Sequence, residues 1–238
     1  DVTDNPQAQG LLAWYPLGPG QYGITQDVLN RHNLTPYAGP VRVGGSRGAA
    51  ASFTKASSQY LAHAGEAFLD YPFMLTCWFR YLTAPNSFAR DVLMCVSDRD
   101  DGYDRDQLNI YNSGTVQLEA FTTTNYDATG AARIDVPSLT LGIWYFAAGI
   151  FRATNSRALY LNANQSAANT TSLSPTTRDT ISIGASVRSS GPTGYVGAEI
   201  ADARIYNRIL TQNEIKNLYR NPSFSILVRI EASATQPV

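Results

Sequence analysis

Residues 194–226, GYVGAEIADARIYNRILTQNEIKNLYRNPSFSI, decide the fold class because a strand-like run passes directly into one short helix. Thr211 and Glu214 have the Thr-x-x-Glu spacing of a capping box. In this motif the Thr hydroxyl accepts a hydrogen bond from the N3 amide, and the Glu carboxylate accepts one from the cap amide. The spacing predicts that the helix begins just after Thr211.

The body of this helix has one apolar stripe, formed by Ile215, Leu218 and Tyr219 at positions i, i+3 and i+4. Asn221-Pro222 ends it, because proline disfavours the helical conformation in the residue before it. A helix of about two turns is not stable by itself in water. We therefore expect its apolar stripe to be docked on a larger β-structure.

The rest of the chain has the pattern of many short strands. Turn signals recur at short intervals, which is typical of an antiparallel sandwich. Strand-like segments occupy residues 10–18, 49–64, 73–82, 91–97, 107–121, 143–165 and 179–187. The segment FMLTCWFRYL (73–82) is apolar on both faces, so we expect it inside a two-layer sandwich or under a helix.

Composition fits one large β-domain. The chain has 238 residues, 44% of them hydrophobic, and a net charge of −1. No basic face emerges, which argues against nucleic-acid binding, and no apolar run is long enough for membrane insertion. Cys77 and Cys95 are either two free core thiols or a single disulfide, since both lie in strand-like runs around one loop.

Several of these stretches together resemble the concanavalin A-like jelly rolls of the laminin-G type. They are GLLAWYPLG, AASFTKASSQYLAHA, FMLTCWFR, GIWYFAAGIFRATNSRALYLNAN, ISIGASV and the strand-then-helix ending, in the family's order over residues 10–220. The resemblance implies an all-β, two-sheet antiparallel jelly-roll sandwich with one short C-terminal helix near the sandwich edge. The domain is expected to span residues 1–222, followed by an extended tail, 223–238.

The chain departs from the family at two places. Acidic residues that help some members bind calcium are replaced by Thr54, Lys55, Ser57 and Ser58, which puts that version of a metal site in doubt. Pentraxins pair the Cys of the strand equivalent to 73–82 with one near the later Trp strand, and WYFAAG has no Cys. The chain is therefore not expected to be a pentraxin.

Enzymatic chemistry has little support in the sequence. Glucanases of this fold resemble one another through Glu-x-Asp-x-x-Glu on one strand, and none of the five glutamates here is followed by x-Asp. Glu199 and Asp202 differ by an odd number, so a regular strand would point them to opposite faces. His32 and His63 give little basis for a triad or a zinc site. We expect no enzyme activity.

The acidic loop SDRDDGYDRD (97–106) is the richest candidate site. The sequence proposes a ligand site formed by Asp98, Asp100, Asp101, Tyr103 and Asp104, and a calcium site formed by Asp98, Asp100 and Asp101, with Asp106 as a further oxygen source. The EF-hand spacing fails, and Arg99 and Arg105 neutralise part of the charge. A solvated turn with local Asp–Arg pairs is the alternative. No other cofactor is expected.

Aromatic residues in loops could stack on sugar rings, and the candidates are Tyr37, Tyr103, Tyr126 and Tyr195. Tyr103 beside Asp101 and Asp104 fits that chemistry best, because carboxylates can bind sugar hydroxyls next to a ring. The three tryptophans lie in strand-like segments and are expected in the core: Trp14, Trp78 and Trp144.

The tail SFSILVRIEASATQPV alternates like a strand, with Phe224, Ile226, Val228 and Ile230 on one face. It is either an extra edge strand of its own sandwich or an arm that pairs with a neighbouring subunit. The arm interpretation predicts a homo-oligomer.

Two functions compete at this point. The first is a non-enzymatic virion surface protein, capsid-decorating or fibre-like, with a capsid or other virion protein as partner and a host glycan as a further ligand. This hypothesis rests on the resemblance of the "LYRNP"-type ending to phage and prophage proteins. The second is an extracellular carbohydrate-binding or adhesion module of a secreted bacterial protein.

Overall fold

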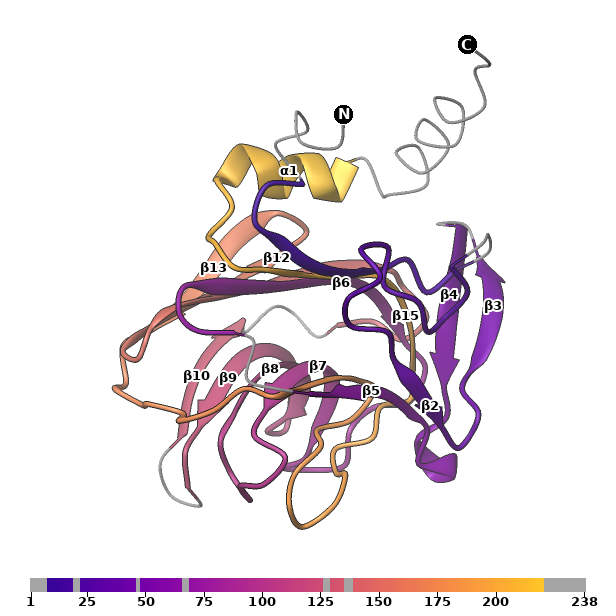
Figure 1. Ribbon diagram of the computed structural model, residues 1–238, viewed down its shortest axis with the longest axis horizontal. Coiled ribbons are helices and arrows are strands. Elements are labelled where there is room, and N and C mark those ends of the chain that lie inside the picture. The colour runs from indigo at the N-terminus through magenta and orange to yellow at the C-terminus, as the bar shows by residue number, and fades with distance from the viewer. Residues whose placement is uncertain are drawn as a thin grey trace.

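The protein is a sandwich of two antiparallel sheets, with one helix on its outside, in a computed structural model (Figure 1). The structure describes residues 8–18, 22–45, 48–65, 69–125, 129–134 and 139–220. The sequence prediction of an all-β, two-sheet jelly roll with a short C-terminal helix is confirmed. The predicted tail, with Phe224, Ile226, Val228 and Ile230, lies outside the described residues.

The eight-stranded sheet contains, in spatial order, β13 (Asn164–Asn169), β12 (Ser156–Leu161), β11 (Tyr145–Ala153), β6 (Phe73–Tyr81), β15 (Ala198–Tyr206), β4 (Gly48–Phe53) and β3 (Val41–Gly45), and β1 (Leu11–Tyr15) also pairs with β15. The seven-stranded sheet contains β10 (Thr129–Ile134), β9 (Val116–Thr123), β8 (Arg105–Asn112), β7 (Arg90–Ser97), β14 (Thr180–Ile183), β5 (Tyr60–Ala64) and β2 (Thr35–Tyr37). A short 3₁₀ turn, Lys55–Ser57, connects β4 in the first sheet to β5 in the second.

Strand β6 explains why residues 73–82 are apolar on both faces. Its odd-numbered side chains, such as Leu75 and Phe79, lie in the core between the two sheets. Met74 and Trp78 point the other way, into a second apolar cluster on the outer side of the eight-stranded sheet. The prediction of a strand buried on both faces is confirmed.

Helix α1 (Gln212–Arg220) covers this second cluster. The resemblance predicted a position near the sandwich edge. Instead, the helix lies over the outer face of the eight-stranded sheet (Figure 1), with the Tyr219 ring stacked on Trp78 of the central strand β6 at 5.4 Å. Ile215 and Leu218 of the helix are buried in the same cluster. The physical reason is that Met74 and Trp78 offer an apolar surface in the middle of the sheet.

The predicted capping box is also confirmed. The Thr211 amide donates to the Glu214 carboxylate at 2.7 Å, and the Glu214 amide donates to the Thr211 hydroxyl at 3.3 Å. Arg208 donates to the same carboxylate at 3.1 Å and to the Gln9 carbonyl at 2.8 Å. The start of the helix is therefore tied to the strand before it and to the N-terminal segment.

The two cysteines are free and buried. Cys77 belongs to the core between the sheets. Cys95 lies on β7 of the other sheet, and its thiol contacts the Ser186 hydroxyl at 3.5 Å. The structure therefore decides between the two alternatives in favour of free thiols. In the part of the chain that the structure describes, no helix has the length and apolar character needed to cross a membrane.

Candidate functional site

The outer face of the seven-stranded sheet is the candidate functional face. Leu108 and Ile110 of β8 point into the core, so the alternating residues Gln107 and Asn109 point outward. Neighbouring strands extend this outward layer of side chains, most of which are buried. The cross-strand rows on it are Ser97, Arg105 and Thr123, then Cys95, Gln107 and Phe121, then Val92, Asn109 and Glu119. Helix α1 covers the opposite side of the molecule and leaves this face to the loops.

The loop of residues 184–197, between β14 and β15, lies against this face (Figure 1). The Val92 amide donates to the Gly194 carbonyl at 2.7 Å, and the Ser97 hydroxyl donates to the Val187 carbonyl at 2.8 Å. A short antiparallel bridge between Ser186 and Thr193 shapes the loop. We call this segment the 184–197 loop.

The acidic loop, residues 98–104 between β7 and β8, is folded by its own carboxylates. The Asp98 carboxylate accepts the amides of Asp100 and Asp101 at 2.9 and 3.2 Å. The Asp101 carboxylate accepts those of Tyr103 and Asp104 at 2.5 and 2.9 Å. These two amides lower the pKa of Asp101. Much of the hydrogen-bonding capacity that the sequence offered to a ligand is thus used to shape the turn.

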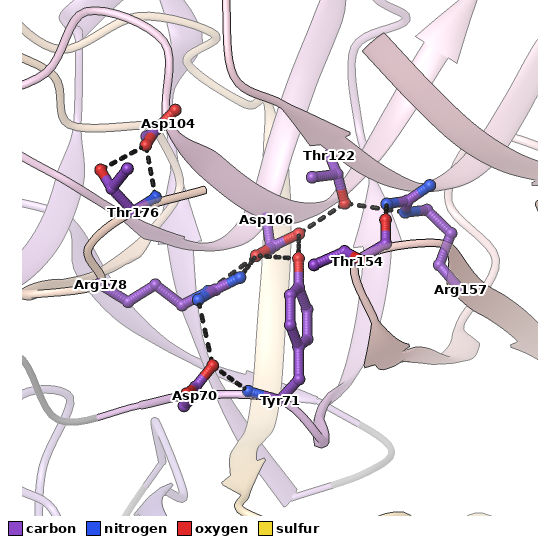
Figure 2. Close-up of polar contacts among 9 residues, drawn as sticks. All are labelled: Asp70, Tyr71, Asp104, Asp106, Thr122, Thr154, Arg157, Thr176 and Arg178. Carbon is purple, nitrogen blue, oxygen red and sulfur yellow. Dashed lines mark hydrogen bonds and ion pairs between the residues drawn. The ribbon is translucent and has the colours of Figure 1, made fainter. Parts of the chain in front are cut away.

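Asp104 and Asp106 are engaged by a segment that is distant in sequence (Figure 2). Asp104 accepts the amide and the hydroxyl of Thr176 at 2.6 and 2.7 Å. Asp106 is fully buried and pairs with Arg178 at 2.7 Å. Both carboxylates therefore fasten the acidic loop to the segment before β14, and Asp106 is no longer available as an oxygen source for calcium.

The Asp106 contacts continue as a buried network between the sheets. Thr122 donates to Asp106, and Arg157 of β12 donates to the Thr122 hydroxyl at 2.9 Å. Tyr71 adds a longer contact at 3.4 Å, and its ring lies 4.3 Å from the Arg178 guanidinium. Burial raises the pKa of Asp106, and the charge of Arg178 opposes this shift. The network ties the two sheets together and is structural.

One group of carboxylates lies close enough for a metal ion. Oxygens of Asp98, Asp100 and Asp179 lie within 4.8 Å of one another. Asp98 and Asp100 were predicted ligands, whereas Asp179 joins them in place of Asp101. The Arg99 guanidinium lies 3.4 Å from Asp179 and 3.8 Å from Asp100. Calcium would compete with this arginine for the same oxygens, so the calcium site stays a prediction.

Three tyrosines form a platform at the β2 side of the outer face. The rings of Tyr37 and Tyr60 are parallel, with 4.4 Å between centroids and 1° between planes. Tyr195 of the 184–197 loop lies 6.1 Å from Tyr60. Tyr37 is 43% exposed. Because one face of its ring is covered by Tyr60, its exposed surface includes the other face. We call these three residues the tyrosine platform.

The platform is held by the turn that follows β2. The Gln59 side chain donates to the carbonyls of Ala38 and Gly39 at 3.1 and 3.0 Å and accepts the Thr54 amide at 2.7 Å. Gly39 adopts a positive φ of 65°, which glycine tolerates without strain. The Tyr37 ring is thus presented from a fixed backbone.

The other predicted aromatic contacts have mixed outcomes. Tyr103 is exposed on the acidic loop, and among the described residues its ring does not contact those of the tyrosine platform. Tyr126 lies outside the described residues. Trp14 and Trp78 are buried, as predicted. Trp144 is only partly buried and packs against the helix-side cluster.

Three carboxylates of the described residues, Glu119, Glu199 and Asp202, are paired with arginines. Glu199 accepts from Arg80 at 2.8 Å, and Glu119 accepts from Arg90 at 2.8 Å. Asp202 lies at a β-bulge with φ of 50°, where it accepts from Arg204 and from the Trp14 indole. The expected regular alternation of Glu199 and Asp202 is therefore interrupted. Each carboxylate has a structural partner.

Sequence reasoning missed several residues of the face. Tyr60 could have been found from its position in a strand-like segment. Arg90, Arg105 and Arg188 could not, because their proximity depends on tertiary contacts between the acidic loop and the 184–197 loop. Only the alternation of residues 107–111 signalled an outward polar row.

Comparison with known proteins places the fold in a family. The family model described as the concanavalin A-like lectin/glucanases superfamily, of the laminin-G type, matches residues 55–216. The chain belongs to this family. The predicted resemblance is confirmed. A search of curated proteins found no match.

Solved structures with the same fold include domain 4 of AbnA, a GH43 extracellular arabinanase from Geobacillus stearothermophilus, in complex with arabinotriose. Its TM-score is 0.65 at 14% identity, and the match covers 88% of this chain and 98% of that one. The binding domain of Paraclostridial Mosquitocidal Protein 1 has a TM-score of 0.68 at 13% identity, covering 89% and 52%.

The botulinum neurotoxin serotype D ligand-binding domain, solved with N-acetylneuraminic acid, has a TM-score of 0.67 at 12% identity, covering 92% of this chain and 53% of that one. This chain thus spans about half the length of the two toxin domains. At these identities the likeness establishes the shared fold. What each neighbour binds is a property of that neighbour.

Proposed function

We propose that this protein is a non-enzymatic saccharide-binding adhesion module whose ligand stacks on the tyrosine platform. The observation that carries the proposal is the parallel pair of Tyr37 and Tyr60, which presents an exposed aromatic surface at the edge of a polar sheet face. A tyrosine ring offers an apolar face for the C–H side of a sugar and a hydroxyl for its polar rim.

Three further points support this proposal. The platform is fixed by Gln59, so little conformational freedom is lost on binding. The arabinanase domain and the serotype D domain, which share the fold, were solved with saccharides bound. The arginine pairing of Glu119 and Glu199 favours binding over glycoside hydrolysis, which uses two free carboxyl groups.

The test is a glycan array followed by titration of the best ligand. Tyr37→Ala is expected to weaken binding at least tenfold, since it removes the exposed ring without removing core contacts. Phe88→Ala, at another exposed aromatic, is the matched control and is expected to leave the affinity unchanged. Tyr103→Ala tests the site predicted from sequence. An array without any binding saccharide refutes the proposal.

The narrower hypothesis is that this module decorates a virion as an oligomer, attached to a capsid or other virion protein. Its support is the resemblance of the sequence to phage proteins. Immunogold labelling of particles from a producing culture tests it, with a matched culture that lacks the gene as control. Labelled particles are expected, and label confined to free secreted protein favours the extracellular module.

A further inference from the structure

Two arginines from different strands lie against one aromatic ring on the outer face. The guanidinium carbon of Arg90 lies 4.2 Å from the centroid of the Phe121 ring, and that of Arg105 lies 6.0 Å from it. Arg90 comes from the start of β7 and Arg105 from the start of β8, so the two side chains approach Phe121 from opposite ends of the strands. Both guanidinium groups therefore lie near the Phe121 ring.

A third arginine joins them from the 184–197 loop. Arg105 donates to the Tyr103 carbonyl at 3.0 Å, and Arg188 donates to the Gly102 carbonyl at 3.3 Å. These are consecutive carbonyls of the acidic loop, which brings the two guanidinium groups together. Arg90, Arg105 and Arg188 thus form one group, which we call the arginine cluster.

The arginine cluster has few counter-charges. Arg90 is paired with the fully buried Glu119. Among the described residues, neither Arg105 nor Arg188 forms an ion pair with a carboxylate. The nearby Asp101 carboxylate accepts two backbone amides of its own loop. The cluster therefore carries excess positive charge.

The pKa of Arg105 is lowered first by burial and further by the positive charges of Arg188 and Arg90, whereas the Asp101 carboxylate opposes the shift. Burial and like charges both disfavour the charged form of a base. An anion placed among these groups would relieve the repulsion.

Buried polar atoms near the arginine cluster also lack hydrogen-bond partners. Asn109 is 0% exposed and Gln107 is 2% exposed. Within the described part of the chain, both amide atoms of Asn109, the Gln107 carbonyl oxygen and the Arg188 Nε have no hydrogen-bond partner. Buried polar groups in proteins are nearly always hydrogen-bonded. These side chains therefore have hydrogen-bonding capacity that the described residues leave unused next to the arginine cluster.

We propose that the arginine cluster binds the anionic group of an acidic saccharide, a carboxylate or a sulfate ester. Arginine forks match both groups through paired charge-assisted hydrogen bonds. The inference rests on the proposed function, because it places the charged end of the same saccharide on the face that carries the tyrosine platform. The 184–197 loop links the two sites, since it supplies both Arg188 and Tyr195.

Calorimetric titration with matched ligand pairs tests this inference. Trigalacturonate is compared with its uncharged methyl ester, and a κ-carrageenan tetrasaccharide with its desulfated form, which carries no other charge, so that the two pairs separate carboxylate from sulfate. We expect at least a tenfold preference for the charged member of one pair, and a decline of this preference as salt is raised.

Variants locate the preference. Arg105→Gln and Arg188→Gln are expected to reduce it to about twofold or less. Arg152→Gln, which removes an exposed arginine from β11 of the other sheet, is the matched control and is expected to keep it. Tyr37→Ala should weaken the charged and uncharged members equally. Circular dichroism checks folding. If Arg105→Gln does not fold, the result for Arg188→Gln decides whether the arginine cluster binds the anionic group, because Arg188 lies in a loop and its substitution is not expected to disturb the sheet.

The outcomes separate this inference from the proposed function. Equal affinity for charged and uncharged members overturns the arginine cluster as a binding site and leaves the tyrosine platform standing. A preference that survives both substitutions also overturns it. Failure of all saccharides to bind, charged and uncharged, overturns both proposals.

Discussion

Glu214 fastens helix α1 to the sandwich, and the energy of this contact can be worked out from the structure. Its carboxylate accepts from the Arg208 guanidinium at 3.1 Å and from the Thr211 amide and hydroxyl at 2.7 and 2.8 Å. These contacts, that with Arg208 above all, lower the pKa of Glu214 from 4.5 to about 2. At about 1.4 kcal/mol for each pH unit, this difference corresponds to about 3 kcal/mol.

The sign of the pH dependence follows from the lowered pKa. The stabilisation is fully present above the unfolded-state pKa of about 4.5 and is lost as pH falls towards 2. Because the Glu214 side chain is 14% exposed, solvent screens part of the interaction. We expect Glu214→Gln to lower the free energy of unfolding by about 2 kcal/mol at pH 7, and the difference from wild type to approach zero near pH 2.

Urea denaturation between pH 7 and pH 2 measures this effect, followed by tryptophan fluorescence because Trp78 stacks on Tyr219 of the helix. Arg208→Gln combined with Glu214→Gln closes a double-mutant cycle, and a coupling of at least about 1 kcal/mol is expected. A difference between Glu214→Gln and wild type that stays constant over this pH range would show that the ionised Glu214 carboxylate does not stabilise the folded state.

Three further predictions concern the buried network, calcium and the tail. Asp106→Asn leaves Arg178 buried without its carboxylate, so we expect a loss of about 3–5 kcal/mol in urea denaturation. Asp70 lies 4.0 Å from the same arginine but is 92% exposed, so Asp70→Asn should lower the free energy of unfolding by less than about 1 kcal/mol. Equal losses of stability in the two variants would contradict the network. Calcium is expected to raise the melting temperature of the wild-type protein, and a chelator is expected to reverse this rise. The melting temperature of Asp100→Asn should not respond to calcium. A wild-type melting temperature that does not depend on calcium refutes the metal site. Deletion of residues 223–238 is expected to abolish oligomerisation and to leave the circular dichroism of the sandwich intact, and unchanged light scattering would contradict the arm.

Local patterns predicted much of the fold correctly. The Thr211–Glu214 spacing located the start of the helix, because a capping box needs only neighbouring residues. The two-faced apolar pattern of 73–82 predicted burial on both sides. The position of the helix over Trp78, rather than at the sheet edge, could not be derived locally, since it depends on which sheet face remains apolar after the strands pair.

The candidate site was harder to predict for a related reason. The acidic loop is conspicuous in sequence, yet Asp104 and Asp106 are engaged by Thr176 and Arg178, about seventy residues further along the chain. The bulge at Asp202 requires a positive φ that no sequence pattern indicates. Charge composition alone suggested solvated Asp–Arg pairs, whereas the arginine cluster forms through contacts between loops.

Saccharide binding at the outer face of the seven-stranded sheet can be measured directly. The most direct measurement is an NMR titration of the labelled protein with the best ligand from the array, following backbone amides. We expect shifts concentrated at Tyr37, Tyr60, Tyr195 and the 184–197 loop, with helix α1 unchanged. Shifts confined to helix α1 and the eight-stranded sheet would contradict saccharide binding at this face.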